Sequence, residues 1–225
     1  MKYFVDYGHG GSDSGAVSSG IYEKNVNRLI GERVKYHLER HNQKVVLTRT
    51  TDEYRSLDER VAIIEQNKCD LGISIHCNSF SDDTVRGVET YTWGNGSKEK
   101  LLATKVHNEI LKAKLYKKNR GLKEEKFRIL SPSIPCCLVE VGFISNVADR
   151  LLILENIEEF AIAITKGLLG YYDMQYYQDK ENNTIPLNQV LFKVQVGAYK
   201  DENNAKKMVE RLRELGFNSI IVQSS

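Results

Sequence analysis

The chain has 225 residues, 41% of them hydrophobic, which is enough to bury the core of one domain and leaves room for a smaller appendage. Its 32 basic and 30 acidic residues give a net charge of +2, so the overall charge favours no nucleic-acid partner. No apolar run reaches the length of a membrane-spanning helix, so we expect no membrane insertion.

The chain opens on a predicted strand over residues 2–6, and a glycine-rich loop after this strand carries His9. Met1 and Lys2 lead straight into the strand, without the apolar segment or the cleavage site of a signal peptide. We therefore expect synthesis in the cytoplasm without a signal peptide.

Helices and strands then alternate along the chain as far as residue 172. After the loop, Val26, Ile30 and Val34 fall on one helical face, which predicts an amphipathic helix over residues 24–40. Further strands are predicted over residues 45–48, 71–75, 87–93 and 137–139. Further helices are predicted over residues 57–65, from a cap at Ser97 through Ile110, from a cap at Ser145 through Leu152, and over residues 158–169. Because several of the strands are continuous apolar runs, they indicate the parallel sheet of an α/β fold.

Four residues able to bind or serve a metal stand near the ends of these elements. His9, His76 and Glu140 each follow a predicted strand, and Glu23 comes just before the first helix. Because α/β folds bring the carboxyl ends of their strands to one rim, we expect these side chains to converge there. Taken singly, each histidine is most simply a hydrogen-bonded structural group, and Glu23 a charge in the first turn of a helix. Glu140 is harder to explain structurally, because a lone carboxylate in an apolar run is costly to desolvate.

The residue types in this set suit zinc chemistry. Two imidazoles and one carboxylate are a common catalytic zinc set, which leaves a fourth position for water or substrate. A second carboxylate that is not a ligand can take a proton from that water and return it to a leaving group. Two histidines and two glutamates at the predicted rim supply one complete set, so the sequence favours a zinc centre with a general base.

Five motifs resemble those of the zinc-dependent N-acetylmuramoyl-L-alanine amidases known as amidase type 3, found in bacterial cell-wall hydrolases and phage endolysins. The motifs lie at residues 6–11, 22–25, 48–50, 74–78 and 139–146. The resemblance covers residues 1–172 and implies a twisted, mostly parallel sheet flanked by helices. It also implies that His9, Glu23 and His76 bind zinc and that Glu140 is the catalytic carboxylate.

The resemblance further implies the reaction, which is hydrolysis of the amide between the lactyl group of N-acetylmuramic acid and L-alanine of the stem peptide. Such an enzyme lyses bacterial cell wall, and without a signal peptide it would act on peptidoglycan after release by another route. Another zinc hydrolase of the wall, such as a carboxypeptidase or deacetylase, could use the same four groups. A non-enzymatic wall-binding protein is the alternative from another class.

Basic residues gather in one stretch of the chain, opposed nearby only by Glu124 and Glu125. They are Lys112, Lys114, Lys117, Lys118, Arg120, Lys123, Lys126 and Arg128. We interpret this stretch as a solvated helix end and loop, and attraction toward an anionic cell wall is the functional alternative. His37, His41 and His107 receive no catalytic role, and His107 is expected at the surface. The four cysteines are expected to pack as small apolar groups.

The last part of the chain differs from the catalytic domain predicted over residues 1–172. Residues 173–189 are polar, contain one proline and lack an apolar period, which predicts a linker. Residues 190–225 predict a small β-α-β unit, and its phrase at residues 194–199 resembles half of the sporulation-related repeat, a peptidoglycan-binding module. Its strands are predicted over residues 191–199 and 219–223, and its helix over residues 203–215. Because so small a unit rarely buries enough surface to be stable alone, we expect it to form a homodimer, dock on the amidase or stay partly disordered.

Overall fold

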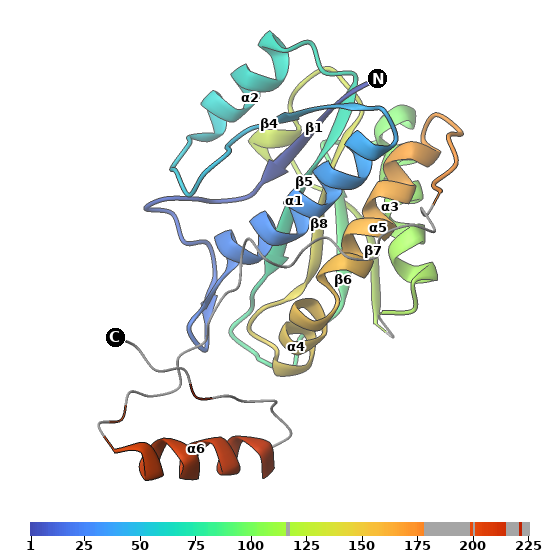
Figure 1. Ribbon diagram of the computed structural model, residues 1–225. Helices are drawn as coiled ribbons and strands as arrows, with labels where there is room; N and C mark the ends of the chain where they lie inside the picture. Colours follow the sequence, from blue (N-terminus) through green and yellow to red (C-terminus); the bar gives the residue numbers. More distant parts are fainter. Residues whose placement is uncertain (116–117, 178–198, 200, 215–220, 222–225) are drawn as a thin grey trace. The chain divides into compact units, whose positions relative to one another are not determined.

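Figure 1 shows the computed structural model, which describes residues 1–115, 118–177, 199, 201–214 and 221. The chain divides into two compact units, Met1–Tyr177 and Gln178–Ser225. None of the helices in the described ranges combines the length and apolar character needed to cross a membrane.

The second unit is described mainly through helix α6 (Glu202–Glu214), close to the helix predicted over residues 203–215. The strands predicted over residues 191–199 and 219–223 lie outside the described residues, apart from Tyr199 and Ile221. The larger part of the predicted linker also lies outside them.

A six-stranded sheet forms the centre of the first unit, in the order β4-β1-β5-β8-β6-β7. Its strands are β1 (Lys2–Tyr7), β4 (Lys44–Leu47), β5 (Leu71–Asn78), β6 (Val88–Thr92), β7 (Asn119–Glu124) and β8 (Cys136–Phe143). Neighbouring strands run parallel throughout the sheet except where β6 meets β8. This mixed sheet of mostly parallel strands confirms the predicted α/β fold.

Helices cover both faces of the sheet, and alternate residues of each strand point to opposite faces. On one face, Val5, Ile73 and Val139 join the larger core, which packs against α1 (Glu23–Arg40), α3 (Ser97–Lys112) and α5 (Ile157–Gly170). Figure 1 shows α1 and α5 lying side by side over this face, with α4 (Val147–Glu155) leading into α5. On the other face, Phe4 and Leu138 join a smaller core with α2 (Leu57–Gln66) and the 3-10 turn η1 (Arg128–Leu130).

The two-residue strands β2 (Val17–Ser18) and β3 (Ile21–Tyr22) form a hairpin just before α1. All four cysteines are buried and unbridged, which confirms their predicted role as packing groups.

The predicted helix caps are wrong at two positions. Helix α3 begins at Ser97 itself, after Gly96, and has no side-chain cap. Helix α4 is capped by Asn146, whose side-chain oxygen accepts a hydrogen bond from the backbone N–H of Asp149 at 3.0 Å. Ser145 instead uses its hydroxyl oxygen to accept the backbone N–H of Phe80 at 3.1 Å. Several polar residues stand near the start of each of these helices, and their position in the sequence alone does not decide which of them caps the helix.

The basic stretch and His107 also differ from their predictions. Residues 119–124 form the edge strand β7 rather than a loop, and a strand paired on one side alone needs no apolar run. His107 is 3% exposed rather than a surface residue. Its Nε2 donates to Asn119 Oδ1 at 2.8 Å, and its Nδ1 accepts the hydroxyl of Thr90 at 2.9 Å. Both nitrogens therefore have hydrogen-bond partners inside the protein, so the buried imidazole leaves no polar atom unsatisfied.

The first unit includes the first five residues of the predicted linker and ends at Tyr177. Tyr176 stacks on His41, with ring centroids 4.8 Å apart, and Tyr177 packs on the same ring at 4.1 Å. The backbone N–H of Tyr177 donates to His41 Nε2 at 3.1 Å, and His41 Nδ1 donates to the carbonyl oxygen of His37 at 2.7 Å. His37 and His41 thus fix the end of this unit to α1.

A buried charge cluster lies beneath the loop that leaves β1. Asp6 is 1% exposed and accepts hydrogen bonds from Arg60 Nη1 at 2.7 Å, from the Ser74 hydroxyl at 2.6 Å and from the Thr48 hydroxyl. Arg60 also donates to the backbone carbonyl oxygens of Tyr7 at 2.9 Å and His9 at 2.6 Å. One carboxylate therefore joins β1, β5, α2 and the end of β4.

We predict that Asp6→Asn lowers the free energy of unfolding by about 3 kcal/mol or more, because it leaves the buried Arg60 guanidinium without its counter-charge. Urea denaturation at pH 7 measures the change. Asp58→Asn is the matched control, since that side chain is 80% exposed and its loss should cost less than about 1 kcal/mol. Equal stability of Asp6→Asn and the wild type would contradict this account of the cluster.

Candidate functional site

Three titratable side chains stand in register across adjacent strands of the sheet. In the pairing of β5, β8 and β6, His76 lies opposite Glu140, and Glu140 lies opposite Glu89. Because residues directly opposite on paired strands share a face, these side chains point to one side of the sheet. It is the face with the smaller core, since Leu138 lies two residues before Glu140 on the same strand. Sheet register therefore brings a basic group and two carboxylates into one row.

His9 approaches this row from the loop after β1. Its backbone has φ 63°, in the left-handed region that non-glycine residues rarely adopt. Arg60 holds the carbonyl oxygen of His9, and Asp13 Oδ2 lies 2.8 Å from His9 Nδ1. That contact leaves Nε2 of His9 turned toward Glu23. Gly8 allows the approach, since a Cβ at this position would lie 2.2 Å from the His76 ring.

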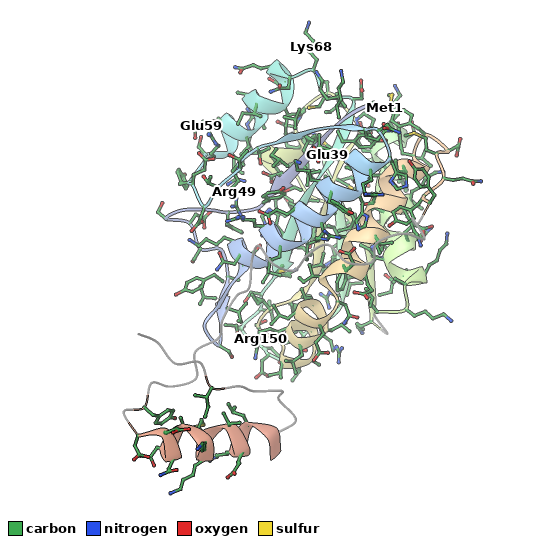
Figure 2. All side chains as sticks on the ribbon, viewed as in Figure 1. Met1, Glu39, Arg49, Glu59, Lys68 and Arg150 are labelled. Atoms are coloured by element: carbon green, nitrogen blue, oxygen red, sulfur yellow. The ribbon has the colours of Figure 1, made fainter. Side chains whose placement is uncertain are left out.

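Arg49 and Lys24 brace the same loop from the side of β4 and α1. Arg49 is 2% exposed, and Figure 2 labels it next to the loop that leaves β1. Its guanidinium donates to the carbonyl oxygens of Tyr7 at 2.9 Å and Lys24 at 2.8 Å. Lys24 Nζ donates to the carbonyl oxygen of Gly11 at 2.8 Å. Charged donors thus hold the loop at Tyr7 and at Gly11.

Glu23, the first residue of α1, lies between the two histidines and is 4% exposed. Its Oε1 is 3.2 Å from His9 Nε2 and 2.9 Å from His76 Nδ1. Its Oε2 accepts the backbone N–H of Ala16 at 2.9 Å, and Oε1 accepts that of Cys77 at 3.1 Å. The carboxylate therefore has a fixed position and faces both imidazoles.

The trio of His9, Glu23 and His76 has the properties of a cation site. One ligand atom from each residue lies within 4.8 Å of the other two. Burial alone would raise the pKa of Glu23, but hydrogen bonds and charges from the two histidines lower it well below its usual range. Burial alone would lower the pKa of His9, but Glu23 and Asp13 raise it to about 9. Among the described residues no other group of His, Cys, Asp or Glu meets the same criterion.

Glu140 is the fourth residue expected from the sequence, and the structure brings it next to the trio. Its Oε2 is fully buried, with no hydrogen-bond partner among the described residues. Burial, opposed by the charge of His76 and assisted by that of Glu23, raises the pKa of Glu140 to about 7. A buried carboxylate oxygen without a partner is costly, and such groups concentrate at functional sites.

Two residues of this region were missed in the sequence. Asp13 receives no role from the sequence, although it stands four residues after His9 and contacts its ring. Glu89 lies within a β-prone run, 1% exposed, beside Glu140. The signal that singled out Glu140, a lone carboxylate in such a run, would also have found Glu89.

Comparison with known proteins identifies the family of the chain. Residues 4–169 match the N-acetylmuramoyl-L-alanine amidase family, and residues 188–225 match the SPOR domain. The chain is similar to the sporulation-specific N-acetylmuramoyl-L-alanine amidase of Bacillus subtilis, with 30% identity over 99% of this chain and 84% of the relative.

Solved structures give the same result for the first unit. N-acetylmuramoyl-L-alanine amidase AmiC2 of Nostoc punctiforme superposes with a TM-score of 0.72 and 37% identity, over 76% of this chain and 97% of that one. The N-acetylmuramoyl-L-alanine amidase of Clostridium difficile 630 superposes with a TM-score of 0.73 and 32% identity, over 76% and 96%. The chain therefore belongs to the N-acetylmuramoyl-L-alanine amidase family and is a hydrolase of that class.

Proposed function

We propose that the chain hydrolyses the amide between the lactyl group of N-acetylmuramic acid and L-alanine in peptidoglycan, with zinc held by His9, Glu23 and His76. Glu140 is the general base in this proposal. The observation that carries it is the buried, unpartnered oxygen of Glu140 beside three convergent ligand atoms. Such an oxygen lacks a structural explanation and suits a group that exchanges a proton with substrate.

The trio fits zinc in donor type and in spacing. Ligand atoms about 2.1 Å from a tetrahedral zinc ion lie roughly 3.4 Å apart, since zinc prefers that geometry. The carboxylate oxygen of Glu23 is 3.2 Å from His9 Nε2 and 2.9 Å from His76 Nδ1, so these two distances need to lengthen only slightly, and all three ligand atoms lie within 4.8 Å of one another. Asp13 supports the arrangement, because a carboxylate on the second nitrogen of a histidine ligand fixes its tautomer and ring orientation.

The chemistry divides between the metal and the carboxylate. When bound, zinc supplies Lewis-acid polarisation of the lactyl carbonyl group. Glu140 takes a proton from the attacking water as the water oxygen bonds to the carbonyl carbon. It then passes this proton to the alanine nitrogen as the carbon–nitrogen bond breaks, which releases the stem peptide with a free amino group. Other zinc hydrolases of the wall share this donor set, and the family match favours the amidase among them.

We propose further that residues 1–172 are the catalytic domain, with residues 173–189 linking it to a unit, residues 190–225, that binds the wall and forms a homodimer. The SPOR match, at residues 188–225, covers all of this last unit. In α6, Ala205, Met208, Val209 and Leu212 recur at the spacing of one helical face, and each is half-buried. An identical unit from a second chain has a matching apolar face, and two-fold symmetry can join the two.

Metal-free protein should bind one zinc ion per chain, measured by calorimetric titration. Glu23→Gln should weaken zinc binding by about 100-fold or more, because it removes the only charged ligand. Mutation of a residue that merely supports a metal ligand already lowers metal affinity by about 10–100-fold. Glu32→Gln, on the same helix and 39% exposed, is the control and should bind zinc like the wild type. Full activity in the presence of chelator, with no zinc bound, would rule out the metal site.

Glu140→Gln should keep its zinc and lose about 100-fold or more of its activity, because the amide cannot accept the proton of the attacking water. The assay counts new alanine amino groups released from intact peptidoglycan. Glu125→Gln, on an exposed residue, serves as the control. Near wild-type turnover by Glu140→Gln would move the base elsewhere. Release of acetate or free amino acids by the wild type, without new alanine amines, would favour a deacetylase or carboxypeptidase.

Removal of residues 178–225 should leave an active monomer with weaker binding to insoluble peptidoglycan, because the first compact unit ends at Tyr177. Sedimentation velocity gives the assembly state, and co-sedimentation with wall fragments gives binding. The full chain is expected to sediment as a dimer. A full chain that sediments as a monomer at all concentrations would contradict the dimer, and equal wall binding by both proteins would contradict the binding role.

A further inference from the structure

Two cations share the buried carboxylate that lies beside Glu140. Lys123 Nζ is 2.8 Å from Glu89 Oε1, and Arg120 Nε donates to the same oxygen. The hydroxyl of Tyr91 donates to the other oxygen of Glu89 at 2.5 Å, and the amide of Asn78 donates to it at 3.3 Å. With two positive charges and one negative charge, this cluster has a formal charge of +1. One cation would have been enough to neutralise Glu89.

The surplus charge is accessible. The side chain of Lys123 is 37% exposed and that of Arg120 is 29% exposed, whereas Glu89 beneath them is 1% exposed. Among the described residues, the side-chain hydrogen bond of Arg120 uses Nε alone, so its two terminal nitrogens keep donors available. A guanidinium with free terminal nitrogens and an ammonium with free hydrogens are the donors that bind a carboxylate most strongly.

Aromatic rings hold both cations in place. The guanidinium carbon of Arg120 lies 5.1 Å from the centroid of the Phe143 ring, and Lys123 Nζ lies 5.6 Å from that of Tyr91. Tyr91 in turn packs edge-on against Phe127, with ring centroids 5.2 Å apart. Because the cations are positioned before any ligand arrives, less conformational entropy is lost when one binds.

Arg120 and Lys123 lie at a distance from Glu140 that suits binding of a substrate group close to the scissile amide. Adjacent strands lie about 4.8 Å apart, so the strand of Glu89 is one spacing from that of Glu140 and β7 is two. An extended peptide advances about 3.4 Å per residue. A stem peptide that runs across the strands toward β7, with its alanine nitrogen at Glu140, therefore brings its next residue over Glu89, within reach of Lys123 and Arg120.

We propose that Arg120 and Lys123 form a subsite for a carboxylate of the stem peptide, carried by the residue that follows L-alanine. The subsite gives the enzyme a preference for acidic over amidated stem peptides, and it rests on the proposed function. A glutamyl residue there has two carboxyl groups, one on its α-carbon and one at the end of its side chain. Both have the same chemistry, so the test treats them separately.

The test compares muramoyl-L-alanyl-glutamate with derivatives amidated at the α-carboxyl, at the side-chain carboxyl, or at both. The full-length zinc-loaded enzyme should lose about 10-fold or more in kcat/KM, chiefly through KM, when the recognised carboxyl is amidated. The derivative that loses activity identifies the source of the carboxylate. Equal kcat/KM for all four substrates would overturn the subsite. No cleavage of any of them would instead refute the proposed function.

The preference is the ratio of kcat/KM for the substrate with the free carboxylate to kcat/KM for the amidated substrate. Lys123→Gln should lower this ratio toward one, because one of the two donors is lost. Arg120→Lys should keep part of the preference, since the charge remains and the paired donors do not. Lys112→Gln, on a lysine of the same basic stretch that is 71% exposed, is the matched control and should keep the wild-type preference. Thermal melting checks that each variant is folded. An unchanged preference in folded Lys123→Gln would overturn the proposal, because a purely structural role for Lys123 predicts that result.

Discussion

The buried Asp6–Arg60 pair is the interaction on which the site depends. Asp6 binds groups from three other elements, and Arg60 continues from it to the carbonyl oxygens of Tyr7 and His9. A buried carboxylate keeps its charge only when donors replace the lost water. The elements that carry those donors therefore occupy fixed positions, and His9 is held in its left-handed conformation by the same guanidinium.

Above this pair, strand register determines which groups meet. His76, Glu140 and Glu89 belong to three strands separated in sequence, and they become neighbours because each is paired with the next. A slip of one residue in either pairing would turn a member of the row to the opposite face. The antiparallel strand β6 matters here, since it places Glu89 beside Glu140, and the neighbouring strand β7 supplies the cations of Glu89.

The parts of the fold that follow from burial were predictable from the sequence. Continuous apolar runs identified β1, β5 and β8. The rule for strand ends predicted that His9, His76 and Glu140 meet, but His76 and Glu140 lie within β5 and β8 and meet through the register of these strands. Strand β7 was not predictable, because its polar edge residues are stabilised by Glu89 rather than by an apolar face. The burial of His107 was missed because its partners Thr90 and Asn119 lie on the strands before and after its helix, and the pattern of the helix alone does not show these contacts.

The central claim is that His9, Glu23 and His76 bind a catalytic zinc ion, and X-ray absorption at the zinc edge tests it most directly. The account predicts a first shell with two imidazole nitrogens and one carboxylate oxygen about 2.0–2.2 Å from the metal, and no sulfur. The imidazole contribution should fall when His76 is replaced by alanine. A sulfur ligand at about 2.3 Å, as buried Cys77 would supply, or a shell of water oxygens alone, would contradict the account.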